Sequence, residues 1–371
     1  MHSMKILITG ANGFIAKNLL VRLSEQGYTD IIRFDRSQRV ADLPSLVEQV
    51  DFAFHLAGVN RPKDEQEFAE GNANLTQALV TALSASGRKI PLVLTSSIQA
   101  ERDNPYGQSK AAAEQLAFDY MKDTGAAAYV YRLPNVFGKW CKPNYNSAVA
   151  TFCYNTVHDL PLTINDENAA LKLVYIDDVC DAFIGLLNDA QSGGYKEVPV
   201  VYTTTVGTVA DLLQKFKQSR YSLLTEEVGV GLTRALYSTY LSYFNPEHFA
   251  YSVPGYTDSR GTFVEMLKTP SAGQFSFFTA HPGITRGGHY HHSKNEKFLV
   301  IKGKASYRFK HIITDERFEL TTDASENKII ETVPGWTHDI TNVGNEELIV
   351  MLWANEIFDR SKPDTIASPL A

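Results

Sequence analysis

Short apolar runs alternate with longer stretches of mixed polarity through the first half of the chain. Lys5–Thr9, Ile31–Phe34, Phe52–Gly58 and Leu92–Ser97 are four such runs, each short enough to be a buried strand. Segments with helical spacing lie between them, and Lys17–Gln26 is the first. Strands that alternate with helices predict an α/β fold with a doubly wound parallel sheet, in which ligands bind beyond the carboxyl ends of the strands.

The pattern changes after Phe249. Phe275–Thr279, Lys297–Ile301 and Leu348–Trp353 are short apolar runs separated by Gly and Pro, and no long helical stretch accompanies them. Many short strands predict an all-β jelly roll or small barrel.

Two apolar helical stretches, Val209–Phe216 and Leu232–Tyr243, come before this change. The second stretch and the residue after it carry an aromatic stripe, which consists of Tyr237, Tyr240, Tyr243 and Phe244. We expect this stripe to pack in a core or between domains. Asn245-Pro246 favours a break in the chain. We therefore predict two domains, residues 4–245 and residues 246–371.

Composition restricts the class of protein. The 371 residues suffice for two cores, and 44% hydrophobic with 21% charged residues is typical of a soluble globular protein. A net charge of -7 argues against a nucleic-acid partner, and no apolar run approaches the roughly 20 residues of a membrane helix. The three cysteines form no Cys-x-x-Cys pair, which favours a reducing cytoplasm. Residues 1–3 have the pattern of a tag remnant before a natural start at Met4 and are left out of the fold prediction.

A glycine turn directly follows the first predicted strand. Gly10, Asn12, Gly13, Phe14 and Ile15 lie in this Gly-x-x-Gly-x-x-Ala turn, which opens a helical stretch. Glycines let the backbone approach a pyrophosphate, which then lies at the positive end of the helix. The turn therefore predicts a dinucleotide site, although glycine turns also occur as plain loops.

The second predicted strand ends at Asp35 and Arg36, where the adenosine ribose of a dinucleotide would lie. An acid favours a free 2′-hydroxyl, whereas an arginine favours a 2′-phosphate. Arg39 is close enough in sequence to form a clamp with Arg36, so we predict NADPH. The alternative is that both arginines are solvated surface residues.

Tyr106 and Lys110 are four positions apart in a helical stretch, which places them on one helix face. A cation beside a phenol lowers the pKa of that phenol, so Tyr106 is a candidate proton donor to a reduced carbonyl. A serine at the end of the fourth strand is a candidate to bind the same oxygen. A surface helix pair is the alternative for Tyr106 and Lys110, and a satisfied core histidine is the favoured interpretation of His55.

Four residues in the second half predict a metal site. His289, His291, Glu296 and His338 supply three imidazoles and a carboxylate, and residues two apart in a strand face the same side. This ligand set suits zinc or another divalent metal. The alternative is a solvated surface cluster of histidines.

Residues 4 to 245 resemble the extended short-chain dehydrogenase/reductase family, whose fold is of the Rossmann type. The resemblance is carried by Gly10-x-x-Gly13, Asp35-Arg36, Leu56-Ala57-Gly58, Ser97, Tyr106-x-x-x-Lys110, Arg132–Gly138 and Leu173–Val179. It implies cofactor contacts for Leu56, Ala57, Gly58 and Asn72. It also implies Ser97 as the carbonyl-binding hydroxyl, Tyr106 as proton donor and Lys110 as partner of the ribose and the tyrosine; Ser96 is the alternative to Ser97.

The spacing of nine positions between Ser97 and Tyr106 departs from that family, which has a longer insertion there. We therefore expect another part of the protein, such as a second subunit of a homodimer, to close the site.

Residues 255 to 360 resemble the cupin family through Gly283-x5-His289-x-His291-x4-Glu296-x6-Gly303 and Pro334-Gly335-x2-His338-x3-Asn342. The resemblance implies that His289, His291, Glu296 and His338 bind a metal with an open coordination position. Arg286-Gly287-Gly288-His289 also resembles the deoxysugar 3,5-epimerase branch, in which the matching histidine is a base. His289 is thus either a ligand or a base, and the metal is either catalytic or structural. Lys294, Lys297, Tyr307 and His311 are unranked candidates for the acid and base.

The two-domain arrangement resembles the bifunctional capsular-polysaccharide enzymes that make UDP-2-acetamido-2,6-dideoxy-β-L-talose. The resemblance implies that the cupin epimerises C3 of UDP-2-acetamido-2,6-dideoxy-β-L-arabino-hexos-4-ulose and that the reductase then reduces C4 with NADPH, on the route to UDP-N-acetyl-L-fucosamine. One alternative is a 4-ketoreductase whose cupin is only structural or dimer-forming. A non-enzymatic sugar-nucleotide binding protein is another.

Overall fold

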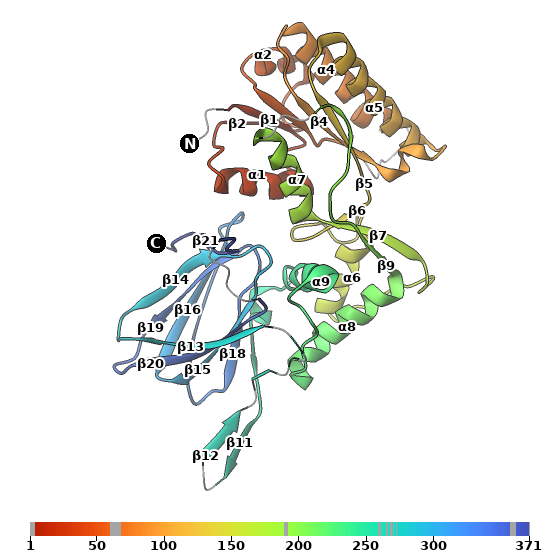
Figure 1. Cartoon of the computed structure of the whole chain (residues 1–371). Helices are drawn as coiled ribbons and strands as arrows, with labels where there is room; N and C mark the ends of the chain where they lie inside the picture. The colour runs from red at the N-terminus through yellow and green to blue at the C-terminus, as the bar shows by residue number, and fades with distance from the viewer. Residues whose placement is uncertain are drawn as a thin grey trace. The chain divides into compact units, whose positions relative to one another are not determined.

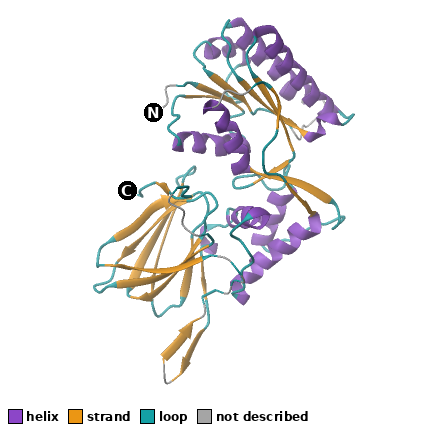
Figure 2. Ribbon diagram, viewed as in Figure 1, coloured by secondary structure: helices purple, strands orange, loops and turns teal. Residues whose placement is uncertain are grey.

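The structure is a computed structural model that describes residues 4–59, 68–188, 192–258, 261–264, 266, 267, 269, 271, 273–356 and 361–370. The chain forms two compact units (Figures 1 and 2). The first contains residues 1–148 and 171–203, and the second contains residues 149–170 and 204–371. The second unit thus includes helices that lie before residue 245. The predicted boundary at residue 245, which separates stretches of different sequence pattern, stays a prediction.

A six-stranded parallel sheet forms the centre of the first unit, in the order β2-β1-β3-β4-β5-β8. Its strands are β1 (Ile6–Thr9), β2 (Ile31–Phe34), β3 (Phe52–His55), β4 (Leu92–Ser97), β5 (Ala128–Leu133) and β8 (Gly194–Lys196). Strands β1 and β3 are buried along their whole length, as expected for a parallel sheet with both faces covered. The predicted doubly wound α/β fold is confirmed.

Helices cover both faces of this sheet. Figure 1 shows α1 (Phe14–Glu25) and α7 (Ile176–Asn188) on one face, and α2 (Leu43–Val47), α4 (Leu75–Ala85) and α5 (Pro105–Thr124) on the other. The short helices are η1 (Val40–Asp42), η2 (Ala69–Asn74) and η3 (Ile98–Glu101), and a small sheet contains β6 (Asn135–Phe137), β7 (Ala170–Tyr175) and β9 (Tyr202–Thr205). No helix among the described residues combines the length and the apolar character needed to cross a lipid bilayer.

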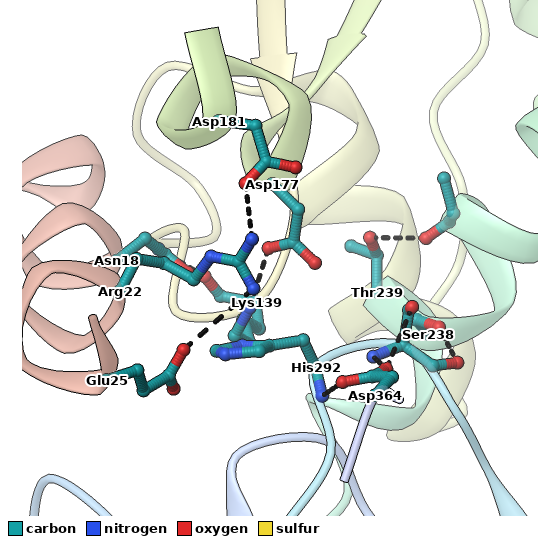
Figure 3. Close-up of polar contacts among 12 residues, drawn as sticks. Asn18, Arg22, Glu25, Lys139, Asp177, Asp181, Ser238, Thr239, His292 and Asp364 are labelled. Carbon is teal, nitrogen blue, oxygen red and sulfur yellow. Dashed lines mark hydrogen bonds and ion pairs between the residues drawn. The ribbon is translucent and has the colours of Figure 1, made fainter. Parts of the chain in front are cut away.

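Ion pairs fix helix α1 in this unit (Figure 3). The guanidinium of Arg22 on α1 binds Asp181 on α7. Lys139 Nζ, whose side chain is 1% exposed, lies 2.9 Å from Asp177 Oδ1, and the carbonyl of Lys139 accepts a 3.2 Å hydrogen bond from Asn18 Nδ2. These contacts hold the helix that begins at the glycine turn.

Two five-stranded antiparallel sheets form most of the second unit, as a jelly roll requires. One sheet contains β10 (Ala250–Ser252), β18 (Lys328–Glu331), β15 (Glu296–Lys302), β20 (Leu348–Ala354) and β13 (Gln274–Ala280). The other contains β17 (Arg317–Asp323), β16 (Lys304–His311), β19 (Trp336–Asn342), β14 (Thr285–Tyr290) and β21 (Ile366–Ala367). A separate hairpin pairs β11 (Gly255–Asp258) with β12 (Gly261–Val264). The predicted all-β cupin architecture is confirmed.

Helices also belong to the second unit: α6 (Ala148–Val157), α8 (Val206–Ser222), α9 (Gly231–Leu241) and η4 (Pro246–His248). The predicted aromatic stripe on and after α9 packs in its core. The ring of Phe216 on α8 lies 5.0 Å from that of Tyr237 and 5.9 Å from that of Tyr240, and Tyr240 also contacts Phe244. Both helices expected from the apolar spacing are therefore confirmed.

A buried charge cluster joins α8 to the first β-sheet of this unit. Lys297 on β15 forms an ion pair with Glu331 on β18, and both side chains are at most 3% exposed. Arg220 on α8 lies 3.6 Å from the second oxygen of Glu331, and its guanidinium lies 4.2 Å from the ring centre of Tyr251. Burial of these charges is tolerable because each cation has a carboxylate or an aromatic face as partner.

We predict that Glu331→Gln lowers the free energy of unfolding of the second unit by roughly 3–5 kcal/mol, since it leaves a buried ammonium without its counter-charge. The matched control is Glu346→Gln, because Glu346 pairs with Lys302 at 3.5 Å while both side chains are about half exposed. That change is expected to cost at most about 1 kcal/mol. Urea unfolding followed by tryptophan fluorescence checks this prediction, and equal midpoints for the two variants would contradict it.

Candidate functional site

A cavity of about 660 Å³ lies in the first unit, beyond the carboxyl ends of the central strands. Nine predicted site residues line it: Asn12, Gly13, Phe14, Ile15, Leu56, Gly58, Ser97, Tyr106 and Lys110. Among the described residues that line it, Lys17, Arg102, Lys110 and Lys142 are cationic and none is acidic. This electrostatic balance suits an anionic ligand such as a diphosphate.

The glycine turn forms one wall of the cavity. Gly10 has a φ of +67°, and a Cβ built on it would lie 2.7 Å from backbone atoms of Ala57. The close approach of the two backbones therefore requires glycine at this position. Gly13 is the N-cap of α1 and has an extended backbone. A helix start of this kind can bind a phosphate, and that role of the turn stays a prediction.

The end of β2 lies outside the residues that line the cavity. Asp35 accepts hydrogen bonds from the amide (2.8 Å) and hydroxyl (2.6 Å) of Ser37 and from Asn12 Nδ2. The bonds from Ser37 hold the pKa of Asp35 below its ordinary value. Arg36 is exposed, and Arg39 forms a 2.8 Å ion pair with Asp42 rather than a clamp with Arg36. The choice between the two nicotinamide cofactors stays a prediction.

Ser97 and Tyr106 both line the cavity and contact each other. The Ser97 side chain is hydrogen-bonded to Tyr106, and Ser97 Oγ accepts a 3.1 Å bond from the amide of Gln99. Lys110 Nζ lies 5.9 Å from the ring centre of Tyr106 and donates a 3.4 Å bond to the carbonyl of Thr95. The structure thus brings the three predicted side chains to one end of the cavity.

The predicted lowering of the Tyr106 pKa is wrong. Burial raises the pKa of Tyr106 above its ordinary value, and the hydrogen bond with Ser97 opposes that shift. Burial also lowers the pKa of Lys110 to about 8, against the attraction of Glu114. The cost of burying a phenolate exceeds the benefit expected from an ammonium beside the ring, so Tyr106 is a protonated phenol at neutral pH.

Ser96 differs from Ser97 in its partners. Ser96 Oγ donates to the buried carboxylate of Glu114, which also accepts bonds from Arg132 Nη2 (2.7 Å) and Tyr195 OH (2.8 Å). Ser96 is therefore held in a structural network, whereas Ser97 is directed to Tyr106. This geometry favours Ser97 as the carbonyl-binding hydroxyl.

Asn72 lies behind the cavity and organises its wall. Its Oδ1 accepts a 2.9 Å bond from the amide of Val59, and its Nδ2 donates a 3.0 Å bond to Ser109 Oγ. A Cβ on Gly58 would lie 3.0 Å from Lys110 Nζ and 3.1 Å from Asn72 Oδ1, so these two polar groups approach the same glycine.

His55 is a satisfied core histidine, as predicted. Its ring nitrogens lie 2.6 Å from Thr9 Oγ1 and 2.8 Å from Thr76 Oγ1. Burial lowers the pKa of His55 to about 3, so the ring is neutral.

The short connection between Ser97 and Tyr106 folds directly onto the start of α5. Asn104 Oδ1 accepts a 2.8 Å bond from the amide of Gly107 and caps the helix. A Cβ on Gly107 would lie 2.2 Å from the carbonyl oxygen of Arg102 and 2.5 Å from that of Gln99. Gly107 thus lets the shortened loop place Gln99 and Arg102 at the cavity.

Sequence reasoning missed these two lining residues and the segment Trp140–Ser147, most of which also lines the cavity. A glycine directly after Tyr106 was the available signal for the loop. No pattern distinguished the second segment.

The four predicted metal ligands come together in the second unit. His289, His291, Glu296 and His338 each offer one ligand atom, and these atoms all lie within 4.8 Å of one another. The three imidazole centres are 4.8 to 5.2 Å apart. His291 Nε2 lies 3.2 Å from Glu296 Oε2, and His338 Nε2 lies 3.5 Å from the same oxygen.

The chemistry of this cluster fits a divalent metal. Among the described residues, neither ring nitrogen of the buried His338 has a hydrogen-bond partner of good geometry, although its Nε2 lies 3.5 Å from Glu296 Oε2. Burial, together with the neighbouring His338 and His291, lowers the pKa of His289 to about 3, so its imidazole is neutral and able to ligate. The hydrogen bond with His291 and the close approach of His338 outweigh burial and hold the pKa of Glu296 well below its ordinary value. Neutral imidazoles and an ionised carboxylate are the forms that zinc binds.

The structure distinguishes the unranked candidates around the cluster. Lys294 Nζ lies 2.8 Å from Glu296 Oε1, which makes it the nearest cation to the ligands. Lys297 instead pairs with Glu331, and His311 Nδ1 accepts bonds from the amides of Ile313 and Thr314. The hydroxyl of Tyr307 is buried without a hydrogen-bond partner among the described residues, and burial raises its pKa.

Comparison with known proteins identifies two regions. Residues 6–201 match the model of the NAD dependent epimerase/dehydratase family, and residues 256–366 match that of the polysaccharide biosynthesis C-terminal domain. The first match covers just over half of the chain.

Individual proteins are similar over nearly the whole length. A Pseudomonas aeruginosa protein named UDP-2-acetamido-2,6-beta-L-arabino-hexul-4-ose reductase is 56% identical over 365 residues, 98% of each chain. The crystal structure of the capsular polysaccharide assembling protein CapF from Staphylococcus aureus is 41% identical, with a TM-score of 0.68 over 99% of this chain and 100% of that chain. The UDP-glucuronic acid 4-epimerase of Bacillus cereus, solved with NAD, is 22% identical over 57% of this chain and 83% of that one, with a TM-score of 0.51, and shares the fold.

We predict that Gly107→Ala destabilises the first unit by about 1–3 kcal/mol, because the new methyl group meets two backbone carbonyls that a side chain cannot displace cheaply. Gly185→Ala in α7 is the matched control, since a Cβ there meets no atom within 4 Å. Gly185→Ala should raise the free energy of unfolding by up to about 1 kcal/mol, because alanine has a higher helix propensity than glycine. Urea midpoints followed by circular dichroism compare the two, and a Gly107→Ala protein as stable as the wild type would refute the packing argument.

Proposed function

The chain belongs to the NAD dependent epimerase/dehydratase family, and from that premise we propose that it is a bifunctional nucleotide-sugar enzyme. The proposed substrate is UDP-2-acetamido-2,6-dideoxy-β-L-arabino-hexos-4-ulose. The cupin domain inverts C3, and the reductase domain reduces the C4 ketone to give UDP-2-acetamido-2,6-dideoxy-β-L-talose for capsule or O-antigen synthesis. The observation that carries the proposal is that one chain holds both a cavity with Ser97, Tyr106 and Lys110 and a buried four-ligand cluster.

The reductase step assigns one role to each polar side chain at the end of the cavity. Ser97 donates a hydrogen bond to the C4 oxygen and orients the ketone. Tyr106 then passes its phenolic proton to that oxygen. The proton is available because the raised pKa of Tyr106 keeps the phenol protonated at neutral pH. Lys110 remains behind the tyrosine as a cation that favours the transient phenolate.

NADPH bound in this cavity would supply the hydride. The open amides at the start of α1 and the cation of Lys17 suit the diphosphate of such a cofactor. NADPH rather than NADH rests on Arg36 and Arg39. The Arg39–Asp42 pair is no obstacle, because Arg39 is 81% exposed and pairs of this kind contribute little free energy. Initial rates with the two cofactors at equal concentration test this preference.

The epimerase step uses the acidity of a carbon next to a ketone. Zinc or another divalent metal held by His289, His291, Glu296 and His338 would supply Lewis-acid polarisation of the ketone oxygen. A base then removes the C3 proton, and return of a proton on the opposite face inverts the centre. We assign His289 to the metal, since its ring lies 4.8 Å from that of His338 within the same cluster.

The connection between Ser97 and Tyr106 is short, and a second subunit could close the site there. We therefore propose that the chain forms a cytoplasmic homodimer. Sedimentation equilibrium of the purified chain tests it.

We predict that Tyr106→Phe lowers kcat for NADPH-dependent reduction of the 4-keto sugar by about 10²–10⁴-fold, because the proton donor is removed. Tyr120→Phe on the same helix is the matched control, since the Tyr120 hydroxyl donates a 2.8 Å bond to the carbonyl of Ile90 in the core. Tyr120→Phe should lower the free energy of unfolding by about 1 kcal/mol and have little effect on kcat. Unchanged turnover in Tyr106→Phe would favour a non-enzymatic sugar-nucleotide binding protein.

We also predict that the chain exchanges the C3 proton of the keto sugar for deuterium in heavy water without any nicotinamide cofactor. Tyr106→Phe should retain this exchange, because it impairs only the reductase step. His338→Asn should abolish it, whereas the control His311→Asn, in the same sheet but bound to a turn, should not. Proton NMR of the sugar measures the exchange. A wild-type chain that reduces the ketone without exchanging C3 would support the alternative of a structural cupin.

A further inference from the structure

A single carboxylate from the segment 361–370 organises the loop that carries two of the candidate metal ligands. Asp364 Oδ1 accepts a 2.8 Å bond from the amide of His292, and its Oδ2 accepts 2.7 Å bonds from the amides of Ser293 and Lys294. The hydroxyl of Ser293 adds a fourth bond of 3.1 Å. Figure 3 shows the Asp364 carboxylate directed to the backbone nitrogen of His292. Three successive amides around one carboxylate fix the backbone between His291 and Glu296.

The backbone carbonyl of the same residue contacts a candidate ligand. Asp364 O lies 2.5 Å from His291 Nδ1. A carbonyl oxygen can only accept a hydrogen bond, so Nδ1 carries the proton. Nε2 is then the ring nitrogen left to bind a metal, and it lies 3.2 Å from Glu296 Oε2 within the cluster.

Strand pairing holds Asp364 in this position. In β21, Ile366 pairs with Tyr290 and Ala367 pairs with His289 on β14. Ser368 then donates a 2.7 Å bond to the carbonyl of Gly288 and accepts a 2.6 Å bond from Thr337 Oγ1 on β19. The segment is therefore attached to both strands that carry the remaining histidines, His289 and His338.

We propose that Asp364 is the positioning residue of the metal centre: its carboxylate shapes the 291–296 loop and its carbonyl selects the tautomer of His291 that ligates through Nε2. This inference rests on the metal site of the proposed function. Partners that orient histidine ligands in this way contribute about 10–100-fold to metal affinity. The sequence pattern does not predict this role of Asp364, because Asp364 lies 73 residues from His291 in the chain.

The test compares Asp364→Asn with the wild-type chain. Asparagine keeps the size of the side chain but replaces one accepting oxygen with an amide nitrogen, which cannot accept the bonds of this loop. The matched control is Asp323→Asn, because Asp323 also accepts an amide bond (2.9 Å, from Ser325) in the same unit but lies at the end of β17, outside the cluster. Zinc affinity is measured by competition with a chromophoric chelator, and site geometry by the visible spectrum of the cobalt(II) form.

We expect Asp364→Asn to weaken zinc binding by about 10–100-fold and to alter the cobalt spectrum, with Asp323→Asn unchanged in both. In the zinc-loaded wild type, ¹⁵N NMR of the histidine side chains should show His291 protonated at Nδ1 and bound through Nε2. If Asp364→Asn only lowers the melting temperature of the metal-free chain and keeps wild-type affinity and spectrum, Asp364 is merely structural and the inference is overturned. A zinc-bound His291 that ligates through Nδ1 overturns it as well.

These outcomes separate the inference from the proposal beneath it. A wild-type chain that binds neither zinc nor cobalt removes the metal site itself and, with it, the role of Asp364. A wild-type chain that binds metal and an Asp364→Asn chain that binds it equally well remove only the inference.

Discussion

Charged groups buried away from water must find partners, and both candidate sites are built around this constraint. In the first unit, the ammonium of Lys110 is buried behind Tyr106, and Glu114, two helical turns after that tyrosine, is bound by Ser96, Arg132 and Tyr195. In the second unit, the ionised Glu296 is surrounded by imidazoles and by Lys294. The structural charges are neutralised within the protein, as at Lys297 and Glu331. At the two sites, polar groups remain available to a ligand. The described residues that line the cavity include cations but no acids, and the part of the chain that the structure describes offers the ring nitrogens of His338 no hydrogen-bond partner of good geometry.

Much of this could be predicted from the sequence because local patterns determine it. The apolar run before Gly10 specified a buried strand, and the glycine turn specified the start of α1, although the helix begins at Phe14 rather than Lys17 because the turn itself supplies the N-cap. The spacing of Tyr106 and Lys110 put both on one face of α5. His289 and His291 lie close together as predicted, although β14 ends at Tyr290 and His291 already belongs to the loop that leads to Glu296. In each case the residues that act together are either neighbours in sequence or aligned by one regular element.

The remainder depends on contacts between distant segments, which periodicity does not contain. The pKa of Tyr106 was predicted in the wrong direction because spacing shows that a cation is near but not how far burial penalises the phenolate. The ion pair of Arg39 with Asp42, one helical turn away, was not foreseen, and the phosphate clamp of Arg36 and Arg39 stays a prediction. Asp364 is the clearest example. Its carboxylate can reach the amides of the 291–296 loop only when β21 pairs with β14, and this pairing depends on the fold of the whole jelly roll rather than on a local motif.

The combination of a reversible and an irreversible step also determines which site controls the product under the proposed function. Deprotonation at C3 can run in both directions, so an epimerase alone yields a mixture set by the stability of the two ketones. Hydride transfer to C4 removes the ketone, and with it the acidity that made C3 labile. The configuration released is therefore the one that the reductase cavity accepts. Selection then depends on the residues around the sugar, including Gln99 and Arg102 on the shortened loop, whose position Gly107 makes possible. Under the proposed function, the metal centre would supply the epimer, and the geometry of the loop before Tyr106 would decide whether it is kept.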